Sequence, residues 1–116
     1  MTNGQKKARD AISSVISVCD TITDILPAYL EAFERDIRSQ WAIEMGLIRI
    51  GEGVNRIPAD ILEQYDGQPW RRIVAMRNFA AHQYDDLDPG RVWRTVTLDI
   101  PALRAYLADV VLEGLH

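Results

Sequence analysis

Apolar residues recur at spacings of three and four along most of the chain, a pattern that predicts amphipathic helices. Two long helices are expected at residues 5–26 and 34–57, and a proline follows each of them directly. Residues 28–33 and 59–65 are each expected to form a short helix. The alternation of apolar and polar residues that marks a β-strand is nearly absent.

The second half of the chain predicts two further main helices. One covers residues 70–82, where helical spacing continues up to a polar segment. The other begins at Asp88, a good N-cap, with Pro89 in the first helical position. We expect Pro101 to bend this last helix and Asp99 to cap its second half. The elements together predict an all-α, up-and-down bundle of four to five helices.

The helix expected at 34–57 is apolar on two sides. One stripe consists of Ile43, Leu47, Ile50, Val54 and Ile57, and the other of Ile37, Trp41, Met45 and Ile48. A helix with two apolar sides must pack against more than one neighbour, and the surplus apolar surface predicts a homodimer. Three glycines, Gly46, Gly51 and Gly53, weaken this helix and are expected to let a neighbouring backbone come close.

Length, charge and cysteine content narrow the class of protein. The 116 residues, 1–116, fit a single domain, and the net charge of −4 argues against a protein coated in positive charge that binds duplex DNA. Cys19 is the only cysteine and falls on an apolar stripe, so we expect it to be buried. With no signal-peptide pattern and no long apolar run, the chain is expected to be cytoplasmic and not inserted in a membrane.

The most distinctive polar cluster is the run Arg77-Asn78-Phe79-Ala80-Ala81-His82-Gln83-Tyr84. Asn78 and His82 lie four residues apart and share a helix face, whereas Arg77 and His82 are separated by about 140° of an ideal helix. An imidazole can take the proton from a ribose 2′-hydroxyl, and a guanidinium can bind the phosphate. The amide of Asn78 can orient either partner, and Tyr84, in the expected loop 84–87, can contact a base or a phosphate. The residues therefore suit RNA cleavage, although a histidine at a helix C-terminus also fits a role in stabilising the helix dipole.

Charged and aromatic residues near this cluster leave more than one interpretation open. Four arginines, Arg71, Arg72, Arg91 and Arg94, are candidate RNA-binding residues, or else part of solvated helix faces. Three aspartates, Asp85, Asp86 and Asp88, would repel RNA unless they point away or pair with arginines. The three tryptophans, Trp41, Trp70 and Trp93, fit core or interface positions better than base stacking. Two glutamates, Glu44 and Glu52, can orient the site or lie on the surface. No spacing of His, Cys and carboxylates indicates a metal site, and we expect neither a metal nor a cofactor.

The chain resembles the HepT toxins of the HEPN superfamily. Residues 77–84 match the R-x4-H-x-Y pattern of that family, and residues 47–53 are similar to its "IGEA" helix. Residues 69–78 look like its "PWREIVGMRN" segment, and residues 88–103 are similar to its "VD…VWETV…DLPEL" tail. The family often has an aromatic residue or glycine after the tyrosine, where this chain has Asp85.

The resemblance implies a homodimer in which two copies of the motif face a shared cleft. It implies a metal-independent endoribonuclease toxin that cleaves tRNA or mRNA, with Arg77 and His82 catalytic and Asn78 supporting. Its partner would be a nucleotidyltransferase antitoxin of the MntA kind, which would add AMP to Tyr84 and so block the cleft with negative charge.

Two other classes of function remain open at this stage. In one, the protein is a non-catalytic subunit that binds a nucleotide or RNA and accompanies a nucleotidyltransferase. In the other, it is a structural dimerisation domain. Cleavage of RNA that depends on His82 separates the enzyme from both alternatives.

Overall fold

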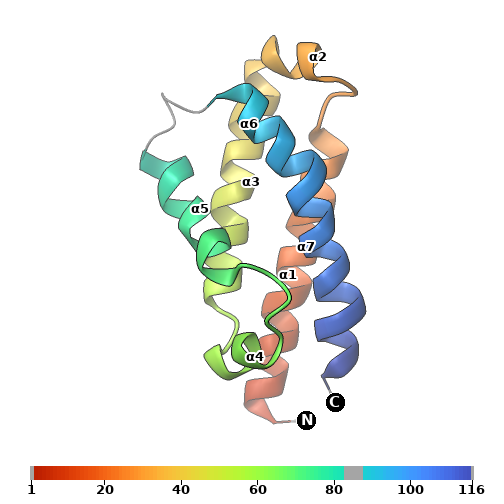
Figure 1. The fold of residues 1–116 in the computed structure, drawn as a ribbon, viewed down its shortest axis with the longest axis vertical. Helices are drawn as coiled ribbons and strands as arrows, with labels where there is room; N and C mark the ends of the chain where they lie inside the picture. The colour runs from red at the N-terminus through yellow and green to blue at the C-terminus, as the bar shows by residue number, and fades with distance from the viewer. Residues whose placement is uncertain (1, 83–87, 116) are drawn as a thin grey trace.

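The structure, a computed structural model, describes residues 2–82 and 88–115, apart from the side chains at positions 79, 81 and 82. Within these residues every regular element is a helix, and the long helices run up and down one axis (Figure 1). The first three long helices are α1 (Asn3–Ile25), α3 (Ile37–Asn55) and α5 (Trp70–His82). Two short helices, α2 (Leu30–Glu34) and α4 (Ala59–Gln64), lie at opposite ends of the bundle. The predicted all-α bundle is confirmed.

The fourth long helix is a continuous rod built from several segments. These are α6 (Pro89–Arg94), η2 (Thr95–Asp99), α7 (Ile100–Tyr106) and η3 (Leu107–Leu112), of which η2 and η3 are π-helical. The rod begins as expected, with the carboxylate of Asp88 accepting a hydrogen bond from the backbone N–H of Gly90 at 3.1 Å.

The predicted cap at Asp99 is wrong. Asp99 has helical φ and ψ of −77° and −40°, and its side chain makes no capping hydrogen bond. A π-helical turn directly before Pro101 widens the helix at the place where the proline ring would otherwise clash with the preceding turn. The helix therefore continues through the proline and needs no second N-cap.

Local capping moves the starts of two other helices from their expected positions. The hydroxyl of Thr2 accepts from the backbone N–H of Gln5 and the side chain of Gln5 accepts from that of Thr2, so α1 begins two residues earlier than predicted. The carboxylate of Asp36 accepts from the backbone N–H of Arg38 at 3.2 Å. This cap starts α3 at Ile37 rather than at residue 34.

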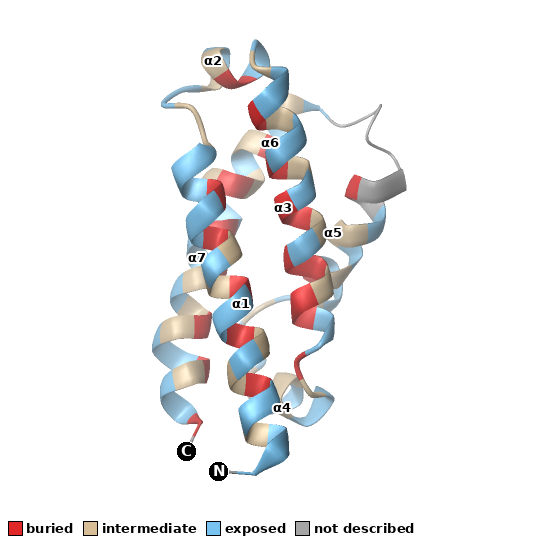
Figure 2. Ribbon diagram, turned by 180° about the vertical axis from the view of Figure 1, so that it is seen from behind, coloured by how far each residue is buried: buried red, intermediate tan, exposed pale blue. Residues whose placement is uncertain are grey.

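The core lies where α1, α3 and the C-terminal rod face one another (Figure 2). On α3 the buried stripe runs through Ile43, Leu47, Ile50 and Val54, as predicted. Two glycines bring α1 close. A Cβ at Gly46 would lie 2.7 Å from Cγ1 of Ile22, and one at Gly53 would lie 2.6 Å from Cγ2 of Val15. These contacts confirm that α3 uses glycines for close packing.

Two tryptophans hold the outer elements against this core through aromatic contacts and a hydrogen bond. Trp93 packs on the buried ring of Phe33 of α2, with ring centroids 5.9 Å apart. Trp70 packs near Tyr106 and donates its indole N–H to the carbonyl oxygen of Tyr65 at 2.7 Å. The expectation that these tryptophans are packing residues is confirmed.

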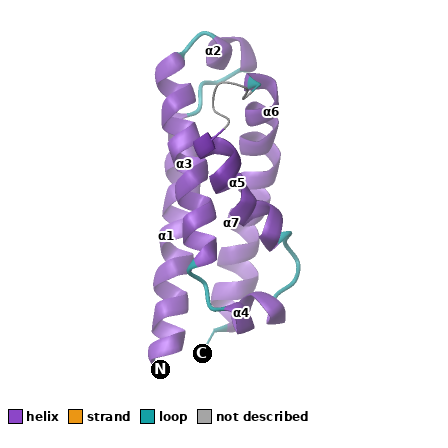
Figure 3. Ribbon diagram, turned by 90° about the vertical axis from the view of Figure 1, so that its left-hand side faces the viewer, coloured by secondary structure: helices purple, strands orange, loops and turns teal. Residues whose placement is uncertain are grey.

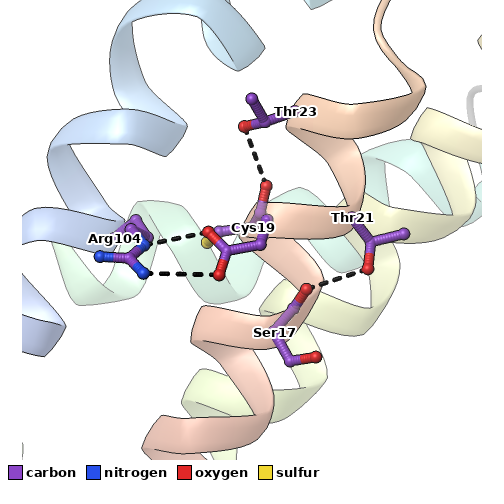
Figure 4. A network of polar contacts seen from close by, with 6 residues as sticks. Ser17, Cys19, Thr21, Thr23 and Arg104 are labelled. Carbon is purple, nitrogen blue, oxygen red and sulfur yellow. Dashed lines mark hydrogen bonds and ion pairs between the residues drawn. The ribbon is translucent and has the colours of Figure 1, made fainter.

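Cys19 lies on the side of α1 that faces Arg104 of the C-terminal rod (Figure 4). Cys19 is buried, as predicted, and loss of solvation raises the pKa of its thiol to about 12, with a smaller contribution from Asp20. One residue along, the carboxylate of Asp20 accepts two hydrogen bonds from Arg104, at 3.0 and 3.4 Å. This exposed ion pair joins α1 to α7 and raises the pKa of Arg104, mainly through the hydrogen bond.

Candidate functional site

The helix α5 carries the polar cluster that the sequence singled out. It packs along α3 (Figure 3), and it meets the C-terminal rod near its own first turn, where Trp70 lies against Tyr106. Ile73 and Ala80 are buried, while Val74 and Met76 are half-buried, so the helix places one apolar face on the bundle. The motif therefore sits on an element that is fixed on one side and open on the other.

Arg77 lies at a close contact between α5 and α3. A Cβ built at Gly51 would lie 2.8 Å from Cβ of Arg77, 3.0 Å from its backbone nitrogen and 3.1 Å from the carbonyl oxygen of Val74. Two of these three atoms belong to the backbone, so no side-chain rotation could make room for a larger residue. The absence of a side chain at Gly51 thus sets the distance between the two helices at the position of Arg77.

The side chain of Arg77 is half-buried, and no ion pair or hydrogen bond to it occurs among the described residues. Within the described part of the chain, no carboxylate therefore competes with an external anion for this guanidinium. Asn78, the next residue, is exposed. Both side chains that sequence analysis placed beside the histidine are therefore available on α5.

His82 is the last residue of α5, so this residue of the motif lies at the helix C-terminus as expected. Its imidazole lies outside the described part of the structure, and so do Tyr84 and the two aspartates that follow it. Their roles remain predictions from the sequence.

The four candidate RNA-binding arginines are all exposed, but they do not form one cluster. Arg72 on α5 and Arg91 on α6 line the same hollow of about 300 Å³ between the two helices. Arg71 and Arg94 do not line this hollow. The structure thus brings one pair of arginines together, with Asp88 beside them.

The edge of α3 next to α5 exposes a stripe of large apolar side chains. Ile37, Trp41 and Met45 are 57%, 66% and 50% exposed. Ile48, the fourth residue of the stripe predicted from the sequence, packs against the core instead, and Trp41 is not part of the core. The homodimer inferred from this stripe stays a prediction. Glu44 lies beside the stripe and is half-buried, and burial raises the pKa of its carboxyl group.

Glu52 does not contact Arg77 by any ion pair within the described residues. Its carboxylate lies 3.9 Å from the guanidinium of Arg56 one turn along α3, in an exposed pair of little energetic weight. Within the same part of the chain, no group of three or more His, Cys, Asp or Glu residues is placed to hold a metal ion. No helix there is long and apolar enough to cross a membrane.

Sequence reasoning missed the hollow between α5 and α6 and the roles of Met76 and Thr95 in its wall. Periodicity shows which face of a helix is apolar, but it carries no information on how far apart two helices lie. The one available signal was the small side chain at Ala75, which is exposed and borders the hollow.

Comparison with known proteins agrees with the resemblance noted from the motifs. Residues 15–110 match the family described as "Ribonuclease HepT-like". The chain is 31% identical over 104 residues to "Probable ribonuclease HepT" of Thermococcus cleftensis, covering 90% of this chain and 93% of that protein.

It is also 28% identical over 107 residues to "Putative RNase MJ0125" of Methanocaldococcus jannaschii, covering 89% of this chain and 92% of that protein. No solved structure gives a significant match.

Proposed function

Because the chain belongs to the HepT-like ribonuclease family, we propose that it is an endoribonuclease whose reaction is centred on Arg77 and His82. The observation that carries the proposal is the position of Arg77. Its helix is fixed against Gly51, and its guanidinium has no carboxylate partner among the described residues. A permanent positive charge of this kind is suited to a phosphodiester that gains charge in the transition state.

The proposed reaction is an internal transfer at phosphorus. The imidazole of His82 takes the proton of a ribose 2′-hydroxyl, whose oxygen then attacks the adjacent phosphorus. The bond from phosphorus to the 5′-oxygen breaks, and an imidazolium returns a proton to that leaving oxygen. Arg77 binds the phosphate oxygens throughout, and the amide of Asn78 orients the scissile group. These reaction steps require no metal ion. This agrees with the amino-acid sequence, which has no metal-ligand spacing.

We propose that the active form is a homodimer formed through the exposed stripe of α3. On an ideal helix, Ile37, Trp41 and Met45 lie roughly 40–120° around the axis from Gly51, on the side next to α5. Burying this stripe against a second copy would therefore bring two α5 helices to the edges of one cleft. Two copies of His82 could then serve as base and acid, as the two proton transfers require.

We also propose that activity is controlled by an antitoxin, with RNA as the toxin's target. Tyr84 lies two residues beyond His82, and AMP added to its phenol would place a bulky negative group beside the proposed catalytic pair. A nucleotidyltransferase of the MntA kind is the partner that the family resemblance indicates. Mass spectrometry of Tyr84 after co-expression with such an enzyme tests this, and an unmodified Tyr84 in a neutralised complex would contradict it.

The enzymatic proposal is tested with purified protein, total tRNA and mRNA in the presence of a metal chelator. Wild type should cleave, while His82→Ala and Arg77→Ala should leave the RNA intact at equal folded fraction. Exposed Arg49 on α3 offers a matched control, because Arg49→Ala removes the same charge outside the motif and should cleave as wild type does. Saturable RNA binding without cleavage by wild type would instead favour the non-catalytic subunit.

A further inference from the structure

A groove lies between α5 and the C-terminal rod, and Leu47 of α3 contributes to its lining. Its upper part is the hollow of about 300 Å³ that contains Arg91, and its lower part is a second hollow of about 420 Å³ that reaches Asp99. The two hollows share Arg72, Met76 and Thr95 as lining residues, so they are neighbouring parts of one groove.

The upper hollow combines an apolar floor with a positive rim. Its apolar lining comes from three helices and consists of Leu47, Ala75, Met76, Ala80 and Val92. The rim carries Arg72 and Arg91, both exposed, and neither has an ion pair or side-chain hydrogen bond within the described residues. Such a site offers an apolar surface for a ring and two guanidinium groups, unpaired within the described residues, for phosphates.

Asp88 is the carboxylate at this end of the groove. Among the described residues it accepts one hydrogen bond, from the backbone N–H of Gly90, and a carboxylate has acceptor positions for further donors. The exocyclic amino groups of nucleobases are donors of the kind that a carboxylate recognises. A negatively charged side chain in a site with two arginines fits a ligand that has both phosphates and amino groups.

We propose that this groove binds one nucleotide of single-stranded RNA next to the cleavage site. The base would lie on the apolar floor between α5 and α6, and its phosphates on Arg72 and Arg91. Arg72 and Arg77 are five residues apart on α5, about 7.5 Å along the helix axis and about 140° around it. A strand held at Arg77 would therefore cross the exposed face of α5 that carries Asn78 and Ala75 before it enters the groove. This inference rests on the proposed function, since it assigns the groove to the same substrate.

The test measures binding of a fluorescent single-stranded RNA that is 2′-O-methylated and so cannot be cleaved, alongside a version in which the bases are missing. Arg72→Ala and Arg91→Ala should each weaken binding about fivefold or more. Each should also reduce the slope of the logarithm of the binding constant against the logarithm of salt concentration by about one. Arg49→Ala is the charge-matched control and should change neither.

A second variant distinguishes binding of the base in the groove from general electrostatic attraction of the RNA backbone. Ala75→Phe fills the mouth of the hollow without changing charge, and Ala42→Phe makes the same change at an exposed position of α3 outside the groove. The proposal predicts that Ala75→Phe loses the preference of wild type for RNA with bases over abasic RNA, whereas Ala42→Phe keeps it. Circular dichroism confirms that each variant is folded.

The proposal is overturned if Ala75→Phe retains that preference, or if the groove arginines behave like Arg49. Because the probe cannot be cleaved, failure of the proposed function has a different signature. In that case wild type leaves natural RNA intact while the groove variants still change binding.

Discussion

Replacing Gly51 with alanine adds one methyl group where α3 and α5 pack closely at Arg77. That methyl would lie 2.8 Å from Cβ of Arg77 and 3.0 Å from its backbone nitrogen. Alanine favours the helix by about 1 kcal/mol over glycine, while overpacking of this kind costs about 1–3 kcal/mol. The net expectation is a loss of about 0–2 kcal/mol in the free energy of unfolding, together with an outward shift of α5.

The effect of Gly51→Ala on catalysis should be larger than its effect on stability. A displacement of about 1 Å at a catalytic group can cost about 10²-fold in rate, because the guanidinium of Arg77 moves with its helix. Gly53→Ala is the matched control, since its methyl would lie 2.6 Å from Cγ2 of Val15, at the contact with α1. It should cost similar stability and leave the position of Arg77 unchanged.

The two variants are compared by chemical denaturation and by the single-turnover rate of RNA cleavage, at a temperature where both are folded. The account predicts a much slower rate for Gly51→Ala and a rate close to that of wild type for Gly53→Ala. Equal rates for the two variants at matched stability would refute the claim that Gly51 positions Arg77.

Three further predictions follow from exposure and burial. Trp41 is 66% exposed. A tryptophan side chain has a surface of about 150–250 Å², so burying the exposed part in a dimer would stabilise the dimer by about 3 kcal/mol. Leu98 of η2 is a matched control, because it is 63% exposed and lies outside the α3 stripe. Sedimentation should show that the Trp41→Ala dimer dissociates at far higher concentrations than the Leu98→Ala dimer, and equal behaviour would exclude α3 as the interface. The thiol of Cys19 stays protonated in the folded state up to about pH 12, whereas in the unfolded chain it ionises near pH 9.0. The free energy of unfolding of wild type should therefore fall relative to that of Cys19→Ala above pH 9.0, by up to about 1.4 kcal/mol per pH unit. If the two proteins lose stability in parallel with pH, the burial of Cys19 is contradicted. Burial raises the pKa of Glu44, so its ionisation opposes folding as pH rises above 4.5, and Glu44→Gln should melt at a higher temperature than wild type at pH 7 but not at pH 4.

Periodicity in the sequence was enough to predict the helices, because each long helix has a continuous apolar stripe that must be buried. Caps were less predictable. Thr2 and Asp36 form side-chain hydrogen bonds that move two helix starts, and Asp99 does not cap because a π-helical turn carries the helix past Pro101. A proline shows that a helix must adjust there, but not whether it will end or widen.

The candidate site was predictable in part. The spacing of residues 77–84 placed the motif at the end of one helix, and the glycines of α3 indicated a close contact, which proved to lie at Arg77. The hollow between α5 and α6 depends on the distance between two helices, which no short-range pattern encodes. The sequence predicted that the helix at 34–57 has more apolar surface than one protomer can bury, but not that Trp41 would be exposed. A single sequence cannot distinguish a core position from an interface between copies.

The central claim is that His82 and Arg77 cleave RNA by internal transfer at phosphorus. The most direct measurement is the chemistry of the RNA ends produced by wild type and by His82→Ala in the presence of a metal chelator. The account predicts 2′,3′-cyclic phosphate and 5′-hydroxyl ends from wild type and no cleavage by a folded His82→Ala protein. Intact RNA with wild type, or the same products and rate from His82→Ala, would contradict it.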